Sequence, residues 1–204
     1  QNPKDIEELM SNLVDYINDK TLEDFDSLVK MAIIHYQFES IHPFYDGNGR
    51  TGRIINILYL VLENLLDMPI LYLSRYIIKH KADYYKLLNE VSFNDGLNNW
   101  ILFMLKGVEE IAKETIETIK NIENLMNETK SIILEQKPKI YSKDLLEALF
   151  YHPYTKRAFI EDHLKISRPT ATNYLNELEN LGILSSKKIG KEIFYIHTKL
   201  FDLF

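Results

Sequence analysis

Twelve consecutive residues, from His42 to Arg53, hold the side chains of this sequence that are best suited to chemistry. The segment reads HPFYDGNGRTGR and combines one imidazole, one carboxylate, two guanidinium groups and three glycines. Guanidinium and backbone N–H groups donate to phosphate oxygens, a carboxylate binds a metal ion, and an imidazole accepts a proton. These residue types indicate a site for a nucleotide polyphosphate.

The elements around this segment are predicted to be helices. Apolar residues recur at three- and four-residue steps over 22–36, which predicts an amphipathic helix that runs to about residue 40. Residues 54–66 are apolar nearly all round, which predicts a helix buried in a core. Pro43 and Gly47 interrupt the helical pattern between them. The segment is therefore a loop that leads to a helix N-terminus, where free N–H groups and the helix dipole favour anions.

The polar residues of the loop match the parts of a metal-bound triphosphate. Gly47, Asn48 and Gly49 can form a nest of backbone N–H groups around phosphate oxygens. Asp46 offers a carboxylate to Mg²⁺, which binds one or two carboxylates together with phosphates and water.

The basic residues complete the expected site. Arg50 and Arg53 are three positions apart, so they share a helix face and can both bind the outer phosphates. Histidine side chains ordinarily titrate at about pH 6.5, near neutral pH, so His42 is a candidate to take a proton from a hydroxyl. This set predicts attack on phosphorus and leaves the reaction open.

The segment resembles the signature of the Fic family, HxFx(D/E)GNGRxxR, and every specified position is met. The resemblance extends over about residues 1–105. It implies a mainly α fold with a helical Fic (Fido) core, and it implies protein AMPylation. In that reaction AMP passes from ATP to a Ser, Thr or Tyr hydroxyl of a target protein, and pyrophosphate is released.

The resemblance also implies residue roles. His42 is expected to be the general base, Asp46 the Mg²⁺ ligand, and Phe44 an anchor of the loop in the core. The residues expected to bind the nucleotide are Gly47, Asn48, Gly49, Arg50, Thr51, Gly52 and Arg53, with Tyr84 and Tyr85 at the adenine site. For this tyrosine pair, packing within a helix is the alternative.

Two features depart from the family pattern. Many Fic proteins carry an inhibitory helix with the motif (S/T)xxxE(G/N), whose Glu pairs with the last motif Arg, and no such string occurs here. The chain also opens at Gln1, where relatives have already passed their target-docking hairpin, so we expect an N-terminally incomplete core. The sequence therefore does not predict how the activity is inhibited or how a target protein binds.

Composition restricts the class of protein. The chain has 204 residues, of which 46% are apolar, enough for one or two domains with a hydrophobic core. It has no cysteine, which excludes disulfides and Cys-ligated zinc and is typical of a cytoplasmic protein. Since no run of eighteen apolar residues occurs, we expect no contact with a membrane interior.

The hydrophobic pattern predicts three parts. We expect helices over 5–18 and 79–91, a turn at 94–96, and one long helix or two in line over 97–136. This pattern indicates a Fic core over 1–105, a connector helix over 106–137 and a separate module over 138–204.

The C-terminal module resembles a small winged helix-turn-helix domain. The predicted elements are helices over 142–150, 155–163 and 169–181, a polar turn over 185–190 and a strand over 193–196. Ser167 is expected to cap the third helix. The lysines expected on the wing are Lys187, Lys188 and Lys191, and the exposed face of the third helix is expected to carry Arg168, Thr170, Thr172 and Asn173.

Charge bears on what this module binds. Residues 1–137 contain 14 Lys and Arg against 22 Asp and Glu, a net of −8, whereas residues 138–204 contain 10 against 8, a net of +2. The acidic first part is no surface for nucleic acid. The third helix and wing of the module could contact DNA, but +2 is a small charge for that purpose. The alternative is a protein-interaction module, including one that forms a homodimer.

The leading hypothesis is a protein adenylyltransferase that uses Mg–ATP and acts on a target protein. The same pocket could instead transfer UMP or another phosphate-linked group, or remove AMP. A hypothesis of a different class is a winged-helix DNA-binding regulator with a vestigial Fic core. The intact His42, Asp46, Arg50 and Arg53 argue against that reading. The target and its acceptor residue are not predicted.

Overall fold

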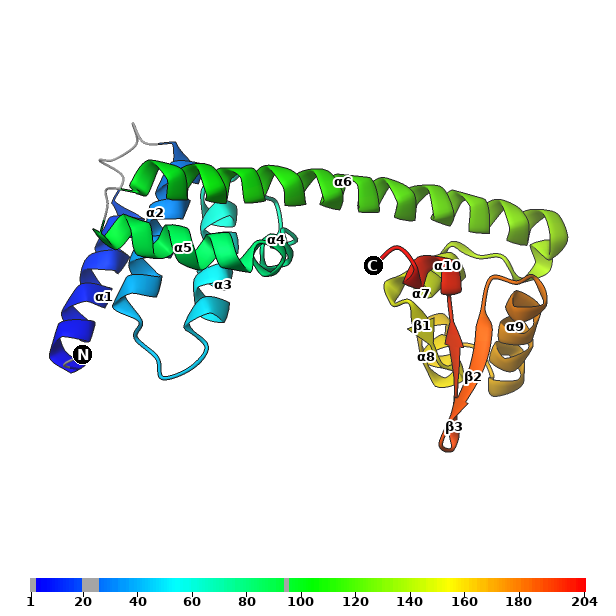
Figure 1. Cartoon of the computed structure of the whole chain (residues 1–204). Coiled ribbons are helices and arrows are strands. Elements are labelled where there is room, and N and C mark those ends of the chain that lie inside the picture. Colours follow the sequence, from blue (N-terminus) through cyan, green and yellow to red (C-terminus); the bar gives the residue numbers. More distant parts are fainter. Residues whose placement is uncertain (1–2, 20–25, 94–95) are drawn as a thin grey trace. The chain divides into compact units, whose positions relative to one another are not determined.

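Helices make up most of this computed structural model, which describes residues 3–19, 26–93 and 96–204 (Figure 1). The chain divides into two compact units, residues 1–115 and 116–204. The division falls inside one continuous helix, so the domain boundaries predicted after residues 105 and 137 stay predictions. None of the described helices combines the length and hydropathy that a membrane-spanning segment needs.

The first unit contains five helices and the start of a sixth in its described residues. They are α1 (Pro3–Asn18), α2 (Ser27–Ile41), α3 (Asn48–Leu62), α4 (Ser74–Lys79), α5 (Lys81–Phe93) and the N-terminal part of α6 (Leu97–Gln136). The helix predicted over 79–91 corresponds to α5, which begins two residues later, since His80 leaves the helical conformation and ends α4. Residues 22–25 of the predicted motif-flanking helix, and the first two residues of the predicted turn at 94–96, lie outside the described residues.

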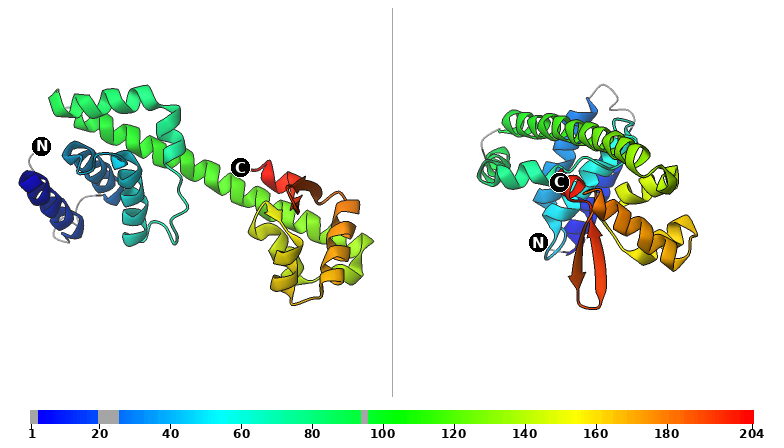
Figure 2. Two further views of the ribbon diagram at one scale, coloured as in Figure 1. Left: turned by 90° about the horizontal axis from the view of Figure 1, so that it is seen from below. Right: turned by 90° about the vertical axis from the view of Figure 1, so that its right-hand side faces the viewer.

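Helices α2 and α3 run side by side and are joined by the motif loop at one end of the unit (Figures 1 and 2). Asp26 begins α2 by accepting the backbone N–H groups of Leu28 and Val29, which satisfies two donors that have no partner within the helix. Apolar residues of α2, α3, α4, α5 and α6 share one core. At its centre Trp100 of α6 is fully buried, and its indole N–H donates to the carbonyl of Ala32 at 2.8 Å.

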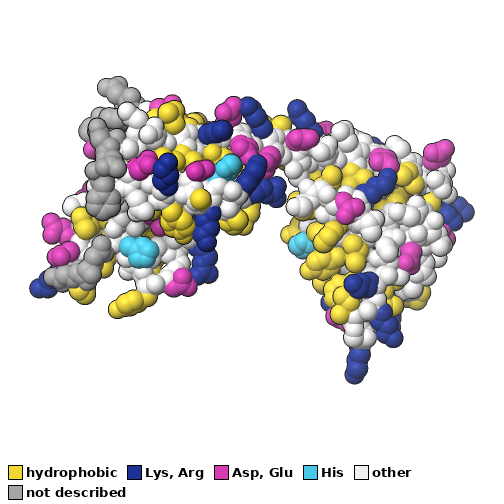
Figure 3. Space-filling model, in the orientation of Figure 1, with side chains coloured by type: hydrophobic (Ala, Val, Ile, Leu, Met, Phe, Trp, Pro, Cys, Tyr) yellow, Lys and Arg dark blue, Asp and Glu magenta, His cyan; other side chains and the backbone are white. Residues whose placement is uncertain are grey.

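The prediction that the helix after the motif is buried all round is wrong. Ile54, Leu58 and Leu62 of α3 expose 56%, 55% and 59% of their surface. These residues recur at four-residue steps, so they form one stripe on the outer side of the helix. Figure 3 shows apolar side chains on the visible surface of this unit. The apolar pattern of the sequence therefore predicted more burial of α3 than the other helices of this unit provide.

A buried histidine links α2, α3, α5 and α6. His35 has no exposed surface, and its ring lies 5.9 Å from that of Trp100 and nearly parallel to it. The Asn56 amide nitrogen lies 3.0 Å from His35 Nδ1, and the Tyr84 hydroxyl lies 3.0 Å from Nε2. Both ring nitrogens of His35 are therefore within hydrogen-bonding distance of a polar side chain. Burial, with a smaller contribution from the charge of Arg53, lowers the pKa of His35 to about 4.

The second unit begins with the remainder of α6. It continues with the 3₁₀ helix η2 (Pro138–Ile140), α7 (Lys143–Tyr151), β1 (Tyr154–Thr155), α8 (Arg157–Leu164), α9 (Arg168–Asn180), β2 (Ser185–Ile189), β3 (Glu192–Ile196) and α10 (Thr198–Phe201). The strands form an antiparallel sheet in the order β1-β3-β2. Its core includes Ile133 of α6, Leu145 of α7, Ile160 of α8 and Leu175 of α9, all without exposed surface.

Ser167 caps α9 as predicted, because its hydroxyl accepts the N–H of Thr170. The prediction of a polar turn over 185–190 is wrong for most of that segment, which is strand β2. The turn consists of Gly190 and Lys191 between paired Ile189 and Glu192, and Gly190 has a φ of 62° that suits glycine. The β2–β3 hairpin extends from the helices of its unit (Figures 1 and 2). That this unit acts as a winged helix-turn-helix domain stays an interpretation.

The buried His35 makes the stability of the first unit depend on pH. The unfolded chain takes up a proton near the ordinary pKa of about 6.5, but the folded ring resists it until about pH 4. The stabilisation is complete above pH 6.5 and is lost as the pH falls from 6.5 to 4. Between pH 7.5 and 5 we expect wild type to lose about 2 kcal/mol more unfolding free energy than His35→Gln.

Urea unfolding followed by fluorescence measures this difference, because Trp100 is the one tryptophan of the chain and lies against His35. A magnetic-resonance titration of the folded protein provides the control and should show a neutral His35 ring at pH 5. Parallel pH profiles for wild type and His35→Gln would contradict the assignment.

Candidate nucleotide-binding site

The motif loop begins and ends on left-handed backbone conformations. His42 ends α2 with φ 50° and ψ 58°, and its N–H donates to the carbonyl of Phe38 at 3.0 Å. Gly47 precedes α3 with φ 91°, a value at which a side chain would be strained. Between them the chain reverses, so that the exposed His42 and the first turn of α3 belong to the same loop.

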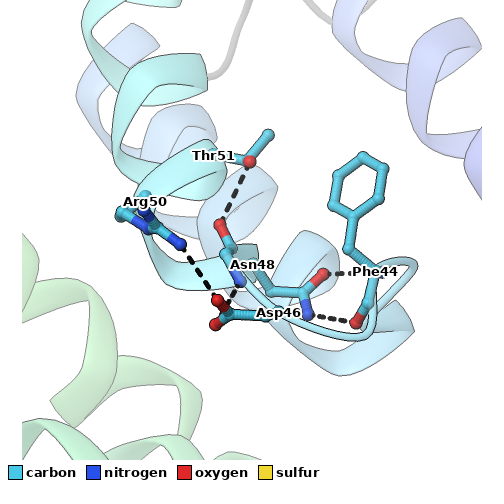
Figure 4. A network of polar contacts seen from close by, with 6 residues as sticks. Phe44, Asp46, Asn48, Arg50 and Thr51 are labelled. Atoms are coloured by element: carbon cyan, nitrogen blue, oxygen red, sulfur yellow. Dashed lines mark hydrogen bonds and ion pairs between the residues drawn. The ribbon is translucent and has the colours of Figure 1, made fainter.

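The side chain of Asn48 holds this loop closed. Its Oδ1 accepts the N–H of Phe44 at 2.9 Å, and its Nδ2 donates to the carbonyl of Phe44 at 2.6 Å (Figure 4). The residue is 3% exposed, so the amide itself cannot reach a ligand in solvent. The sequence prediction gave Asn48 a backbone role and missed this bridge. The one feature of the sequence that could have indicated the bridge is the Asn48 amide at the start of the helix, because an amide offers both a donor and an acceptor.

Phe44 is not the core anchor that was predicted. It is 49% exposed, and its ring centroid lies 6.3 Å from that of Phe38. Its backbone, rather than its ring, is what the structure fixes. The neighbouring Tyr45 is fully exposed, so the loop presents two aromatic side chains to solvent.

The first turn of α3 offers backbone donors. No side chain caps this helix, so the N–H groups of Asn48, Gly49 and Arg50 are not used by a cap. Thr51 strengthens the turn, because its N–H and its hydroxyl both donate to the carbonyl of Gly47, at 2.9 and 3.1 Å. An anion at this end would meet the free N–H groups and the positive end of the helix dipole.

Asp46 lies beside this turn and faces solvent. Its Oδ1 accepts the N–H of Gly47 at 2.7 Å, and its Oδ2 accepts from Arg50 at 3.1 Å (Figure 4). The Asp46 side chain is 92% exposed and that of Arg50 is 71% exposed, so the pair can separate at little cost. Within the described residues no three His, Cys, Asp or Glu side chains gather to bind a metal by themselves. A single carboxylate fits an ion that takes its other ligands from phosphate and water.

The two arginines have different partners. Whereas Arg50 reaches Asp46, the Nε of Arg53 donates to the hydroxyl of Ser74 at 2.7 Å. The hydrogen bond to Ser74 spans 21 positions of the sequence, and no motif indicated it. Arg50 is therefore exposed and loosely held, while Arg53 is partly buried and tied to another helix.

Gly52 faces α2 instead of the loop. A Cβ at this position would lie 2.8 Å from Glu39 Oε1 and 3.1 Å from His35 Cε1. The glycine therefore lets α3 approach α2 closely, and its predicted contact with a nucleotide stays a prediction.

The predicted tyrosine pair is divided between core and surface. Tyr84 is 4% exposed and bonds to His35, and burial raises its pKa. Tyr85 is 53% exposed. Tyr84 therefore has a packing task, and only Tyr85 presents its ring to solvent.

Comparisons with known proteins find similarity to two described families, each over part of the chain. Residues 1–60 match the Fic/DOC family, and residues 125–200 match the family described as protein adenylyltransferase SoFic-like, C-terminal domain. A solved structure of a Fic family protein from Desulfovibrio desulfuricans G20 has a TM-score of 0.53 at 22% identity. The match covers 96% of this chain and 56% of that chain, and it shows a shared fold.

Curated relatives carry the name of one activity. The chain is 27% identical over 142 residues to the protein adenylyltransferase fic-1 of Caenorhabditis elegans, which covers 69% of this chain and 27% of the relative. It is 31% identical over 107 residues to the protein adenylyltransferase Fic of Nematostella vectensis, which covers 52% of this chain and 23% of the relative. The chain thus spans about a quarter of the length of these relatives.

The fold and the loop define a helical protein in which an uncapped helix N-terminus follows the motif loop. The first 60 residues of the chain are similar to the Fic/DOC family, and residues 125–200 are similar to the SoFic-like C-terminal domain.

The bridge from Asn48 to Phe44 predicts a cost for its removal. Asn48→Ala leaves two partly buried backbone groups of Phe44 without partners, so we expect a loss of about 2 kcal/mol in unfolding free energy. Urea unfolding followed by Trp100 fluorescence measures the loss. Asn89→Ala, at an exposed position of α5, is the matched control and should change stability little. Equal stability of the two variants would show that the bridge does not hold the loop.

Proposed function

We propose that this chain transfers AMP from ATP to a Ser, Thr or Tyr hydroxyl of a target protein and releases pyrophosphate. The observation that carries the proposal is the uncapped N-terminus of α3, next to an exposed His42 and two arginines. Such a turn binds phosphate, and the imidazole stands where a nucleophile could lose its proton. The names of the relatives support the same activity.

The proposed reaction uses these groups in order. The N–H groups of Asn48 and Gly49 bind the inner phosphates, while Arg50 and Arg53 bind the outer ones. His42 removes the proton from the acceptor hydroxyl, whose oxygen attacks the α-phosphorus. The bond from that phosphorus to the bridging oxygen breaks, and pyrophosphate leaves with both electrons of the bond. The tight loop closed by Asn48 fixes the position of His42 relative to the phosphates.

Asp46 is the residue that would hold Mg²⁺. Its exposed carboxylate lies beside the phosphate-binding turn, and an exposed ion pair to Arg50 is weak enough to exchange. When bound there, Mg²⁺ would neutralise phosphate charge. Asp46 and Arg50 would then separate, which frees Arg50 for the phosphates.

Two alternatives use the same groups. The loop recognises phosphates, so it binds UTP as well as ATP unless a contact to the base discriminates. We propose the exposed ring of Tyr85 for that contact. Removal of AMP from a modified protein is the other alternative, and it requires water as the nucleophile.

His42→Ala tests the proposed base. We expect transfer to slow by about 10²–10⁴, because the acceptor hydroxyl keeps its proton, while ATP binding stays near the wild-type value. Intact mass spectrometry of the chain incubated with Mg²⁺ and ATP, UTP or CTP measures what is added, and calorimetry measures binding. His163→Ala, an exposed histidine of the second unit, is the control. Wild-type rates in His42→Ala would refute the assignment.

We propose nucleic-acid binding as a second function, carried by a basic pocket of the second unit. The pocket has a volume of about 310 Å³ and lies between α8, α9 and β3, and its lining includes Lys156, Arg157, Arg168, Thr172 and Lys191. Lys156 pairs with Glu192 and Arg157 with Glu161. Among the described residues Arg168 and Lys191 have no such partner. Figure 3 shows dark-blue basic side chains at the tip of the hairpin that bounds this pocket.

A gel shift of the full chain with mixed DNA duplexes at several salt concentrations tests this function. Replacing Lys187, Lys188 and Lys191 by Ala should reduce the salt dependence of log K by about 0.9 for each phosphate that the variant no longer neutralises. The control replaces three lysines of the first unit, Lys81, Lys86 and Lys113. If no duplex shifts, the protein-interaction reading, including a homodimer, stands instead, and light scattering of the chain then tests it.

A further inference from the structure

The guanidinium of Arg53 is held from one side by a short helix. Its Nε donates to Ser74 Oγ at 2.7 Å, and Ser74 is the first residue of α4. The hydrogen bond uses Nε and leaves the terminal nitrogens to other partners. Gly49 leaves room for them, since a Cβ at that position would lie 3.1 Å from Arg53 Nη1.

A competing partner lies on another side of Arg53. Glu39 Oε1 is buried, and it has no hydrogen-bond partner among the described residues. The same Cβ at Gly49 would lie 3.8 Å from this oxygen, so guanidinium and carboxyl flank Gly49. Burial raises the pKa of Glu39, while the charges of His42 and Arg53 act in the opposite direction. No ion pair joins Glu39 and Arg53 in the described residues, although each would satisfy the other.

Ser74 is itself held in place, because α4 is fixed on α6. Tyr76 of α4 packs against Gly107, and a Cβ at Gly107 would lie 2.6 Å from the tyrosine ring. The ring centroid of Tyr76 is 5.1 Å from that of Phe103. Lys79 at the other end of α4 pairs with Glu110 at 2.6 Å. The short helix is therefore anchored by packing and by charge, so its first residue is a fixed point.

We propose that Ser74 is a positioning residue that keeps Arg53 directed toward the outermost phosphate of a bound triphosphate. The inference rests on the proposed function, in which Arg53 binds that phosphate. Ser74 fixes Nε, so the terminal nitrogens do not settle on the buried Oε1 of Glu39. A serine hydroxyl that is not in contact with substrate thereby sets the preference for a triphosphate over a diphosphate.

Calorimetric binding of ATP and of ADP to the full chain, both with Mg²⁺, tests this role. We expect Ser74→Ala to weaken ATP binding about fivefold and to change ADP binding less than twofold, because ADP lacks the phosphate that Arg53 contacts. Arg53→Ala should weaken ATP binding about tenfold or more and should likewise spare ADP. In the Arg53→Ala background, Ser74→Ala should have no further effect, since its role passes through that arginine.

Ser27→Ala is the matched control, because Ser27 is also the first residue of a helix and its hydroxyl donates to the Glu63 carboxylate at 2.8 Å. It should leave both affinities unchanged. Equal losses for ATP and ADP in Ser74→Ala, wild-type affinities, or an undiminished effect without Arg53 would overturn the inference alone. A wild-type chain that binds neither nucleotide would overturn the proposed function and the inference with it.

Discussion

The amide of Asn48 bonds both backbone groups of Phe44, and the geometry of the motif depends on this bridge. It joins the middle of the loop to the first residue of α3, so the chain between them closes into a tight turn. The exposed His42 begins this loop, and the loop ends at a helix N-terminus that no side chain caps. Because the amide is buried, solvent cannot compete for these hydrogen bonds. The loop is thus formed before any ligand arrives, which reduces the entropy that binding must offset.

The packing under the loop allows α2 and α3 to approach each other. Gly52 offers no side chain at the contact, and His35 and Glu39 fill the space where one would lie. His35 then bonds to Asn56 and Tyr84, which ties three helices through a neutral imidazole. These polar groups lie next to the motif, because the charge of Arg53 acts on His35 and the charges of His42 and Arg53 act on Glu39. The packing of the core of this unit therefore also supports the candidate site.

The sequence predicted those features that depend on local chemistry. Pro43 and Gly47 indicated the loop, and the apolar spacing indicated helices on both sides of it. Contacts between distant segments were not predictable from spacing. The bond from Arg53 to Ser74 and the burial of Tyr84 depend on how α4 and α5 dock, which no periodicity encodes.

Other differences come from patterns that more than one structure satisfies. The exposed stripe of Ile54, Leu58 and Leu62 shows that an apolar helix need not be covered on all sides by its own unit. Strand β2 was read as a turn because its residues are polar, yet it pairs along its whole length with β3, whose Tyr195 is buried. An exposed strand at the edge of a sheet has no apolar face that would reveal it.

The central claim is that the first turn of α3 binds the phosphates of a nucleotide. Its most direct measurement is an amide magnetic-resonance spectrum of the nitrogen-15-labelled chain during addition of Mg²⁺ and ATP. The account predicts the largest shifts for the N–H signals of Asn48, Gly49 and Arg50, since these donors would contact phosphate oxygens. Unchanged signals at these residues, with shifts elsewhere in the chain, would contradict it.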